Sequence, residues 1–312
     1  MTVWTRWAAV AVVFVCVLAT GSNTQAQVPE GVYRLTPNAC LERGCLPPCM
    51  CPIMLGAHLR GTFEVALSTA SEEACWTMYD VTDVNWYLTL EGKEIMITGG
   101  GFYRISATKP AMHQMVLELK IGDEEPVKFD SGIVPVKPIE KGLIDIRVAM
   151  NDFYCFDTII RVSAKFVPEK EILRYKVFDS KYQQGCWPPC ECVLWEPVPV
   201  EGEFSLVSLD SPTEETPWDE YAMVRVNWDV GWPWGEVGMK VRGFGRYIHS
   251  DPSLKPLHRM TAMLSFDGDA PLWFDSELVK AKDGIKVIDI TITRNKFYCF
   301  DQVFYLHAVV TD

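Results

Sequence analysis

The chain has 312 residues, of which 48% are hydrophobic, and 41 acidic against 29 basic side chains give it a formal net charge of −12. A chain this acidic repels phosphate backbones, so nucleic acid is excluded as an expected partner. The charge suits a protein that must stay soluble after export, and the length suits one or two domains.

The first 26 residues have the pattern of a secretory signal peptide. Arg6 supplies a positive charge, an uncharged run at 8–19 follows it, and Thr24 and Ala26 have the spacing of a small-residue cleavage site. The run is too short to span a membrane comfortably, and no second apolar segment follows it. We therefore expect cleavage after Ala26 and a mature chain without a membrane span, either secreted or held in the periplasm or cell envelope.

The rest of the chain is one unit that occurs twice. The octet GCLPPCMC at 44–51 recurs as GCWPPCEC at 185–192. Further matches keep the same order: VNW at 84–86 and 226–228, IDI at 144–146 and 288–290, and FYCFD at 153–157 and 297–301. Such collinear matches indicate an internal duplication, with a first domain at 28–168 and a second at 172–312.

Apolar and polar side chains alternate within each unit. His113, Met115 and Leu117 share one face of a predicted strand, and the alternation in the last strand of each unit places Phe156 and Phe300 on its apolar face. A period of two is typical of half-buried strands, and turn residues separate these strands at intervals of about 8–12 residues. The sequence therefore predicts two tandem all-β domains, each an antiparallel sandwich or, alternatively, a barrel.

The cysteines predict disulfides. Apart from Cys16 in the signal segment there are ten: Cys45, Cys49, Cys51 and Cys155 in the first unit, the matching Cys186, Cys190, Cys192 and Cys299 in the second, and the additional Cys40 and Cys75. An even number in an exported chain indicates pairing of all ten, and Cys40 and Cys75 are gained together as a pair would be. We expect one cysteine of each trio to bridge to the FYCFD strand and the other two to pair locally. The alternatives are a thiolate metal site and a redox pair, although the spacing lacks the two close ligand pairs of a structural zinc site.

Catalytic residue types also recur in the two units. His113, Asp130 and Ser131 match His258, Asp275 and Ser276. These are the ingredients of nucleophilic catalysis, but both histidines lie on the apolar face of a strand, which favours a framework role. Carboxylates, namely Asp145 with Asp289 and Asp157 with Asp301, form a second candidate for a hydrolase.

Tryptophan distinguishes the second unit from the first. Candidate binding residues there are Trp187 in the octet, Trp218, and Trp232 with Trp234 in the segment VGWPWGE. Aromatic rings offer a large contact area at low entropic cost, so this pattern is typical of glycan or protein surfaces. We therefore predict an exported, disulfide-stapled, non-enzymatic binding or structural module without a cofactor. Its expected partner is a protein or a glycan, and the alternatives are a secreted hydrolase and a thiolate metal-binding protein.

Overall fold

The computed structural model describes residues 28–46, 48–49, 54–69, 75–90, 92–136, 142–209, 218–231, 238–250, 256–282 and 284–311. The predicted signal peptide lies outside these residues. Within them no helix is long and apolar enough to cross a membrane.

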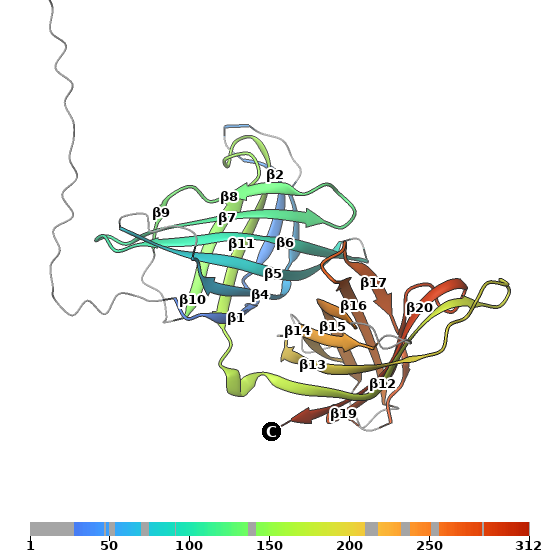
Figure 1. Ribbon diagram of the computed structural model, residues 1–312. Helices are drawn as coiled ribbons and strands as arrows, with labels where there is room; N and C mark the ends of the chain where they lie inside the picture. Colours follow the sequence, from blue (N-terminus) through green and yellow to red (C-terminus); the bar gives the residue numbers. More distant parts are fainter. Residues whose placement is uncertain are drawn as a thin grey trace, which may run out of the picture.

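The first half of the chain forms one antiparallel sheet (Figure 1). Its strands are β1 (Gly31–Leu35), β2 (Cys40–Cys45), β3 (Met54–His58), β4 (Arg60–Leu67), β5 (Trp76–Leu90), β6 (Lys93–Ser106), β7 (Met112–Ile121), β8 (Val127–Asp130), β9 (Val134–Pro135), β10 (Leu143–Ala149) and β11 (Phe156–Phe166). Each strand after β4 pairs with the next long strand along the chain, and β11 returns to pair with β1.

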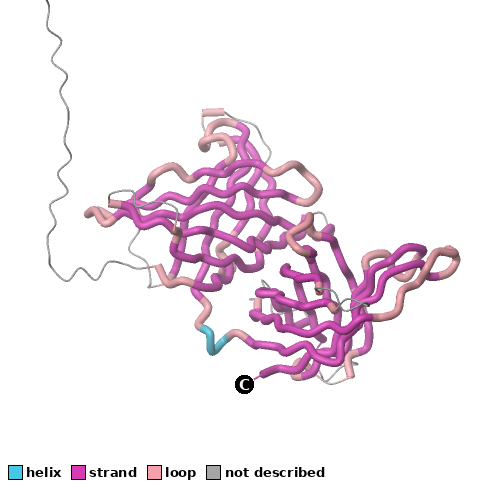
Figure 2. Tube along the Cα trace, viewed as in Figure 1, coloured by secondary structure: helices cyan, strands magenta, loops and turns pink. Residues whose placement is uncertain are grey.

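The second half repeats this arrangement. Its strands are β12 (Leu173–Trp187), β13 (Val198–Ser208), β14 (Trp218–Val230), β15 (Met239–Ser250), β16 (Leu257–Phe266), β17 (Leu272–Asp275), β18 (Val279–Lys280), β19 (Val287–Thr293) and β20 (Cys299–Thr311). The single strand β12 takes the place of both β1 and β2, because it pairs with β20 along nearly its whole length. A 3₁₀ turn, η1 (Glu169–Glu171), separates the two sheets (Figure 2).

Both sheets close into barrels. Among the described residues the closed ring of the first sheet has eight strands, β1, β4, β5, β6, β7, β8, β10 and β11. In the second sheet the matching ring closes through β15 and β16, whose pairing runs from Val241 with Phe266 to His249 with His258. The prediction of two duplicated all-β domains is confirmed, and of the two architectures considered the chain forms the barrel.

The alternation in the sequence explains how each barrel is filled. Met115, Leu117 and Leu119 point inward from β7 and are fully buried, and Met260, Ala262 and Leu264 repeat this on β16. The tryptophans of the two VNW segments, Trp86 and Trp228, are also fully buried. Eight strands enclose an interior just wide enough to be filled by side chains or to hold one small ligand.

The two barrels contact each other through buried charges. The Glu220 carboxylate on β14 pairs with the guanidinium of Arg60 at 2.8 Å and with that of Arg246 at 2.6 Å. Nearby, the Asn85 amide on β5 donates a hydrogen bond of 2.8 Å to the carbonyl of Gly245 on β15. An apolar cluster also links the halves, and its members are Val32, Val167, Ile172, Val207, Leu209, Ala222 and Val224. Because these contacts are buried, they hold the two barrels in one arrangement.

Candidate functional site

The candidate site is the end of the second barrel where β12 and β20 extend beyond the ring. We call it the second tip and define it as residues 184–195 and 294–300. There, Trp187 at the end of β12 pairs with Cys299 at the start of β20. The returning chain runs beside β12, with an isolated bridge between Gly185 and Leu194. The second tip is therefore a two-stranded projection with a loop folded against it.

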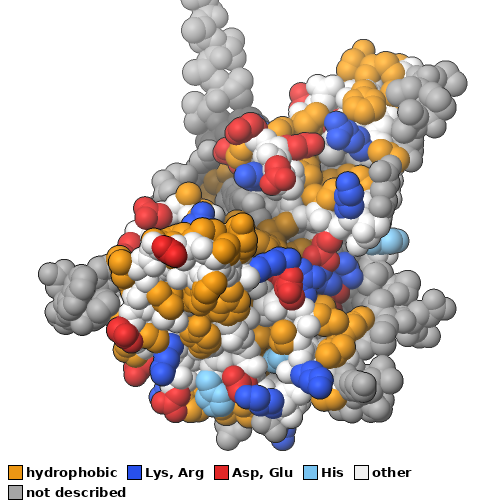
Figure 3. All heavy atoms as spheres, turned by 90° about the vertical axis from the view of Figure 1, so that its right-hand side faces the viewer, with side chains coloured by type: hydrophobic (Ala, Val, Ile, Leu, Met, Phe, Trp, Pro, Cys, Tyr) orange, Lys and Arg blue, Asp and Glu red, His pale blue; other side chains and the backbone are white. Residues whose placement is uncertain are grey.

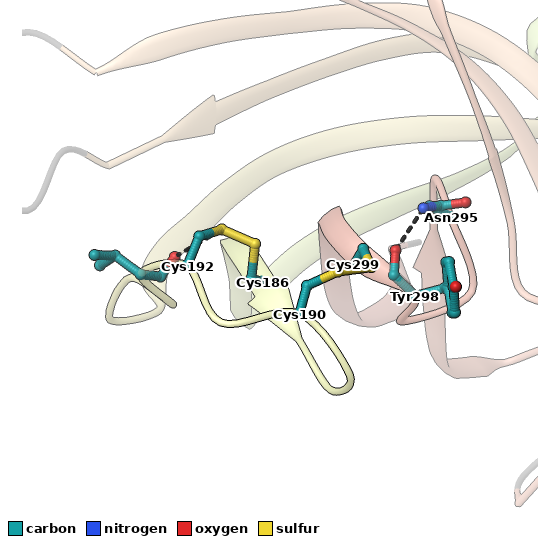
Figure 4. Close-up of a disulfide and its surroundings, with 7 residues drawn as sticks. Cys186, Cys190, Cys192, Asn295, Tyr298 and Cys299 are labelled. Carbon is teal, nitrogen blue, oxygen red and sulfur yellow. Dashed lines mark hydrogen bonds between the residues drawn. A yellow bond between two sulfur atoms is a disulfide. The ribbon is translucent and has the colours of Figure 1, made fainter.

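Two disulfides hold the second tip together, as Figure 4 shows. Cys186 pairs with Cys192 within the octet, and Cys190 pairs with Cys299 across 109 residues of chain. The first unit has the matching long bridge between Cys49 and Cys155. This confirms the prediction that one cysteine of each trio bridges to the FYCFD strand, and such bonds are compatible with an oxidising extracellular environment.

The cysteines private to the first unit do not pair with each other. Cys40 is a free thiol, whereas Cys75 is disulfide-bonded, as is Cys45. Cys40 lies on β2 opposite His58 and Arg161, and its thiol is directed to the Glu42 carboxylate at 3.8 Å. Cys75 instead lies directly before β5. The prediction that Cys40 is part of a disulfide is therefore wrong, and the remaining cysteine of the first trio, Cys51, lies outside the described residues.

A buried aspartate shapes the turn of the second tip. Asp301 is fully buried, and its carboxylate accepts four backbone N–H groups, from Arg294 (3.0 Å), Asn295 (2.8 Å), Phe297 (2.6 Å) and Gln302 (2.7 Å). In this turn Lys296, Phe297 and Cys299 have φ of 54°, 60° and 52°. Such left-handed conformations are unfavourable for these residue types and persist only where the surroundings enforce them. Asp301 and the long disulfide together provide that constraint.

The second tip exposes large apolar side chains. Tyr298 is 60% exposed, Phe300 is 53% exposed and Val193 is 69% exposed, and Leu194, Trp195 and Phe297 are also exposed. The second tip projects to the right in Figure 1. Figure 3 views the molecule from that side, and hydrophobic side chains gather on the face that it shows. Trp187 packs edge-on against Phe297, with ring centroids 5.6 Å apart. The second tip therefore presents several exposed apolar side chains on a projection that two disulfides hold, and exposed apolar surface marks interaction sites on soluble proteins.

The first barrel has a related tip. Asp157 is buried and accepts N–H groups in the same pattern, for example from Phe153 at 2.8 Å. Tyr154 and Phe156 are exposed there like Tyr298 and Phe300. The alternation that placed both phenylalanines on a buried face therefore fails at this point. The physical reason is that β11 and β20 leave the barrel at their first residues, where no opposite wall covers them.

The candidate tryptophans do not all meet at the second tip. Trp187 belongs to it, but Trp218 begins β14 and is paired with Ser250, at the opposite end of the barrel. Trp232 and Trp234 lie outside the described residues. Sequence reasoning missed Tyr298, Phe300 and the exposed residues from Val193 to Trp195. The signal that marks them is the position of FYCFD beside a bridged cysteine, where a strand runs into a loop.

The residues proposed for catalysis have other partners. The Tyr247 hydroxyl lies 3.0 Å from Nδ1 of His258, within the barrel. The Ser276 hydroxyl donates to the carbonyl of Glu277 and accepts the N–H of Met260. The Asp275 carboxylate is bound by Arg259. The first unit repeats these contacts between His113 and Tyr103 and around Ser131. In both units the serine hydroxyl therefore forms hydrogen bonds with backbone groups, one of them on the neighbouring strand.

The other carboxylates are also engaged. Asp145 receives both ends of the Arg161 guanidinium at 3.0 Å, and Asp289 pairs with Lys282 at 2.5 Å. No group of three or more potential metal ligands occurs among the described residues. The cysteines of the second tip are in disulfides and offer no thiolate to a metal.

The fold and the second tip define a tandem pair of up-and-down antiparallel barrels with disulfide-stapled tips. No protein-family model, curated protein or solved structure matches this chain.

Proposed function

We propose that this protein is a non-enzymatic binding module exported to an oxidising compartment, and that it contacts its partner with the second tip. The observation that carries the proposal is the exposed apolar surface formed by Val193, Leu194, Trp195, Phe297, Tyr298 and Phe300. Burying such side chains against a partner is favourable at about 25 cal/mol per Å² of apolar area. Because two disulfides and Asp301 already fix the loops, binding costs little ordering entropy.

The signal-peptide pattern and the disulfides support the exported location. The partner class that suits the second tip is a protein or a glycan, since exposed tyrosine, phenylalanine and tryptophan rings contact both. The sequence also predicts Trp232 and Trp234 as binding residues, and they lie in the same half of the chain as the second tip.

The test is a pull-down from extracellular proteins and polysaccharides with the full chain as bait. We expect Tyr298→Ser/Phe300→Ser to reduce capture at least tenfold, because both substitutions remove apolar area from the centre of the contact. The matched control is Leu67→Ser/Ile133→Ser, which removes two apolar side chains of similar exposure (52% each) away from the second tip. Trp232→Ala/Trp234→Ala is measured beside them.

Circular dichroism must show that all variants fold. Unchanged capture by the Tyr298→Ser/Phe300→Ser protein, or an equal loss in the Leu67→Ser/Ile133→Ser control, would contradict the proposal. Turnover of a captured polysaccharide or peptide would instead favour the hydrolase alternative.

A further inference from the structure

The first barrel contains a cavity that lies apart from the second tip. Its volume is about 160 Å³, and it opens at the end of the barrel that carries the Cys49–Cys155 disulfide. The described residues that line it are mainly aliphatic and come from the ring strands β5, β6, β7, β8 and β11 and from the adjoining β2 and β3; they include Leu41, Leu88, Ile95, Leu119, Val127 and Phe129. Leu88, Leu119 and Phe129 are fully buried, so the cavity reaches the interior of the barrel.

At the equivalent place of the second barrel, the described residues enclose a much smaller space. A hollow lined by Tyr182, Val198 and Met239 measures only about 10 Å³, room for about one water molecule. The two units are therefore related by duplication but differ at this place, and substitutions between matching strands contribute to the difference.

The strand register identifies side chains that differ between the two barrels at this place. Leu41 pairs with Ile160 in the first barrel, and Tyr182 pairs with Phe304 at the matching position of the second. Likewise Ile121 pairs with Ile97, whereas its counterpart Phe266 pairs with Val241. Three aliphatic side chains of the first barrel are thus replaced by three aromatic rings in the second.

The aromatic rings of the second barrel occupy the place that corresponds to the cavity of the first. In the second barrel the ring centroids of Tyr182 and Phe304 are 4.8 Å apart, and those of Phe274 and Phe304 are 5.4 Å apart. Phe266 lies 5.8 Å from Tyr182. In the first barrel Phe129 is the only aromatic residue among the described residues that line the cavity, and it takes the position of Phe274. The second barrel therefore fills with its own rings the volume that the first leaves open.

The size and lining of the cavity select a class of ligand. A dry cavity of ~150 Å³ lined by Leu, Ile and Phe binds benzene, so about 160 Å³ is enough for one six-membered ring. Charged side chains, namely Arg43, Glu124 and Glu125, lie at the rim and are exposed. They leave the interior apolar and allow a polar part of a ligand to remain in water.

We propose that the first barrel binds a ring-sized hydrocarbon group, such as the aromatic ring of a small molecule, in this cavity, and that the second barrel is a filled copy without this activity. The site is separate from the second tip, so the inference is independent of the proposed function.

The test uses benzene and n-hexane as probes of the full-length protein. Benzene is expected to raise the thermal unfolding temperature saturably, and n-hexane to bind several-fold more weakly because a ring fits the space better. In Leu41→Phe/Ile121→Phe, which introduces rings as in the second barrel, the affinity for benzene should fall at least tenfold. Phenylalanine is preferred to tyrosine at position 41 because the partners of the Tyr182 hydroxyl, Gln184 at 3.0 Å and Gln302 at 2.8 Å, are replaced by Arg43 and Thr158 in the first barrel.

A second measurement uses only the wild type, so it does not depend on whether this variant folds. Crystals of the wild type under xenon pressure should show xenon beside Leu119 and Phe129 and none at Phe266 in the second barrel. The proposal is overturned by the absence of xenon from the first barrel, by a wild type that benzene does not stabilise, by n-hexane binding as tightly as benzene, or by undiminished benzene binding to Leu41→Phe/Ile121→Phe.

Discussion

Among the single residues, His258 is a titratable side chain inside the second barrel. Its side chain is buried, and its cross-strand neighbour His249 is buried too. Nε2 of both rings lacks a hydrogen-bond partner among the described residues. Burial lowers the pKa of His258 to about 4, the nearby His249 acts in the same direction, and Asp289 opposes them. His258 is therefore neutral in the folded protein at physiological pH.

This makes the second barrel sensitive to acid. The unfolded chain takes up a proton at His258 below about pH 6.5, whereas the folded protein does so only below about pH 4. The free energy of unfolding should therefore fall as the pH is lowered from 6.5 to 4, by up to about 3 kcal/mol from this group. Urea unfolding of the wild type and of His258→Gln across this range measures the effect, and the variant should lose correspondingly less stability. Identical slopes in the two proteins would show that His258 is not responsible.

At the scale of the element, β20 has two roles along its length. From Val303 onward it is a barrel strand with buried Val303, Phe304 and Leu306. Its first residues belong to the second tip, where the strand exposes Phe300 and is attached through Cys299 to Cys190. One strand thus connects the core to the candidate binding surface, and the long disulfide fixes the connection.

The two disulfides of the second tip should differ in their effect on stability. Removing the Cys190–Cys299 bond, which spans 109 residues, is expected to lower the free energy of unfolding by about 4–5 kcal/mol in the chain-entropy model. Removing Cys186–Cys192, which spans 6 residues, should cost less than about 3 kcal/mol because it closes a short loop. Urea unfolding of Cys190→Ser/Cys299→Ser and Cys186→Ser/Cys192→Ser compares them. A larger loss for the short bridge would contradict the entropic explanation.

At the scale of the whole molecule, Glu220 links the two barrels. It is buried between Arg60 of the first barrel and Arg246 of the second, and Arg246 also pairs with Glu94 and lies over the Tyr87 ring at 5.5 Å. Arg225 of β14 adds an ion pair of 2.9 Å to Glu64 of β4. Ion pairs therefore join the two barrels at more than one point.

Glu220→Gln should uncouple the barrels. The substitution leaves the partly buried Arg60 and Arg246 without their shared carboxylate, which we expect to cost about 2–4 kcal/mol. Differential scanning calorimetry is then expected to resolve two transitions in the variant and one in the wild type. The control is Asp229→Asn, which breaks the exposed pair with Lys240 and should cost less than about 1 kcal/mol. A single, unshifted transition in Glu220→Gln would show that the interface does not depend on this residue.

The candidate site was only partly predictable. The octets and the FYCFD motif correctly indicated a bridge between a loop and the last strand, because the same cysteines recur in both units. Cys40 was assigned to a disulfide wrongly, since the sequence does not show which cysteines come within bridging distance. Phe156 and Phe300 were assigned to a buried face, since alternation within a strand says which side chains share a face but not whether a second wall covers it. The cavity was equally hidden, although the exchange of Leu41, Ile121 and Ile160 for aromatic residues is written in the aligned repeats.

The sequence alone was enough to establish the duplication, the all-β class and a bridge from each cysteine octet to the FYCFD strand, because period, order of motifs and cysteine positions are local properties of the chain. The choice between sandwich and barrel required the folded structure, since closure depends on whether β1 meets β11 and β15 meets β16. The folded structure alone showed the exposed second tip and the open interior of the first barrel. Exposure and free volume depend on what residues far apart in the chain leave uncovered, and no single segment carries that information.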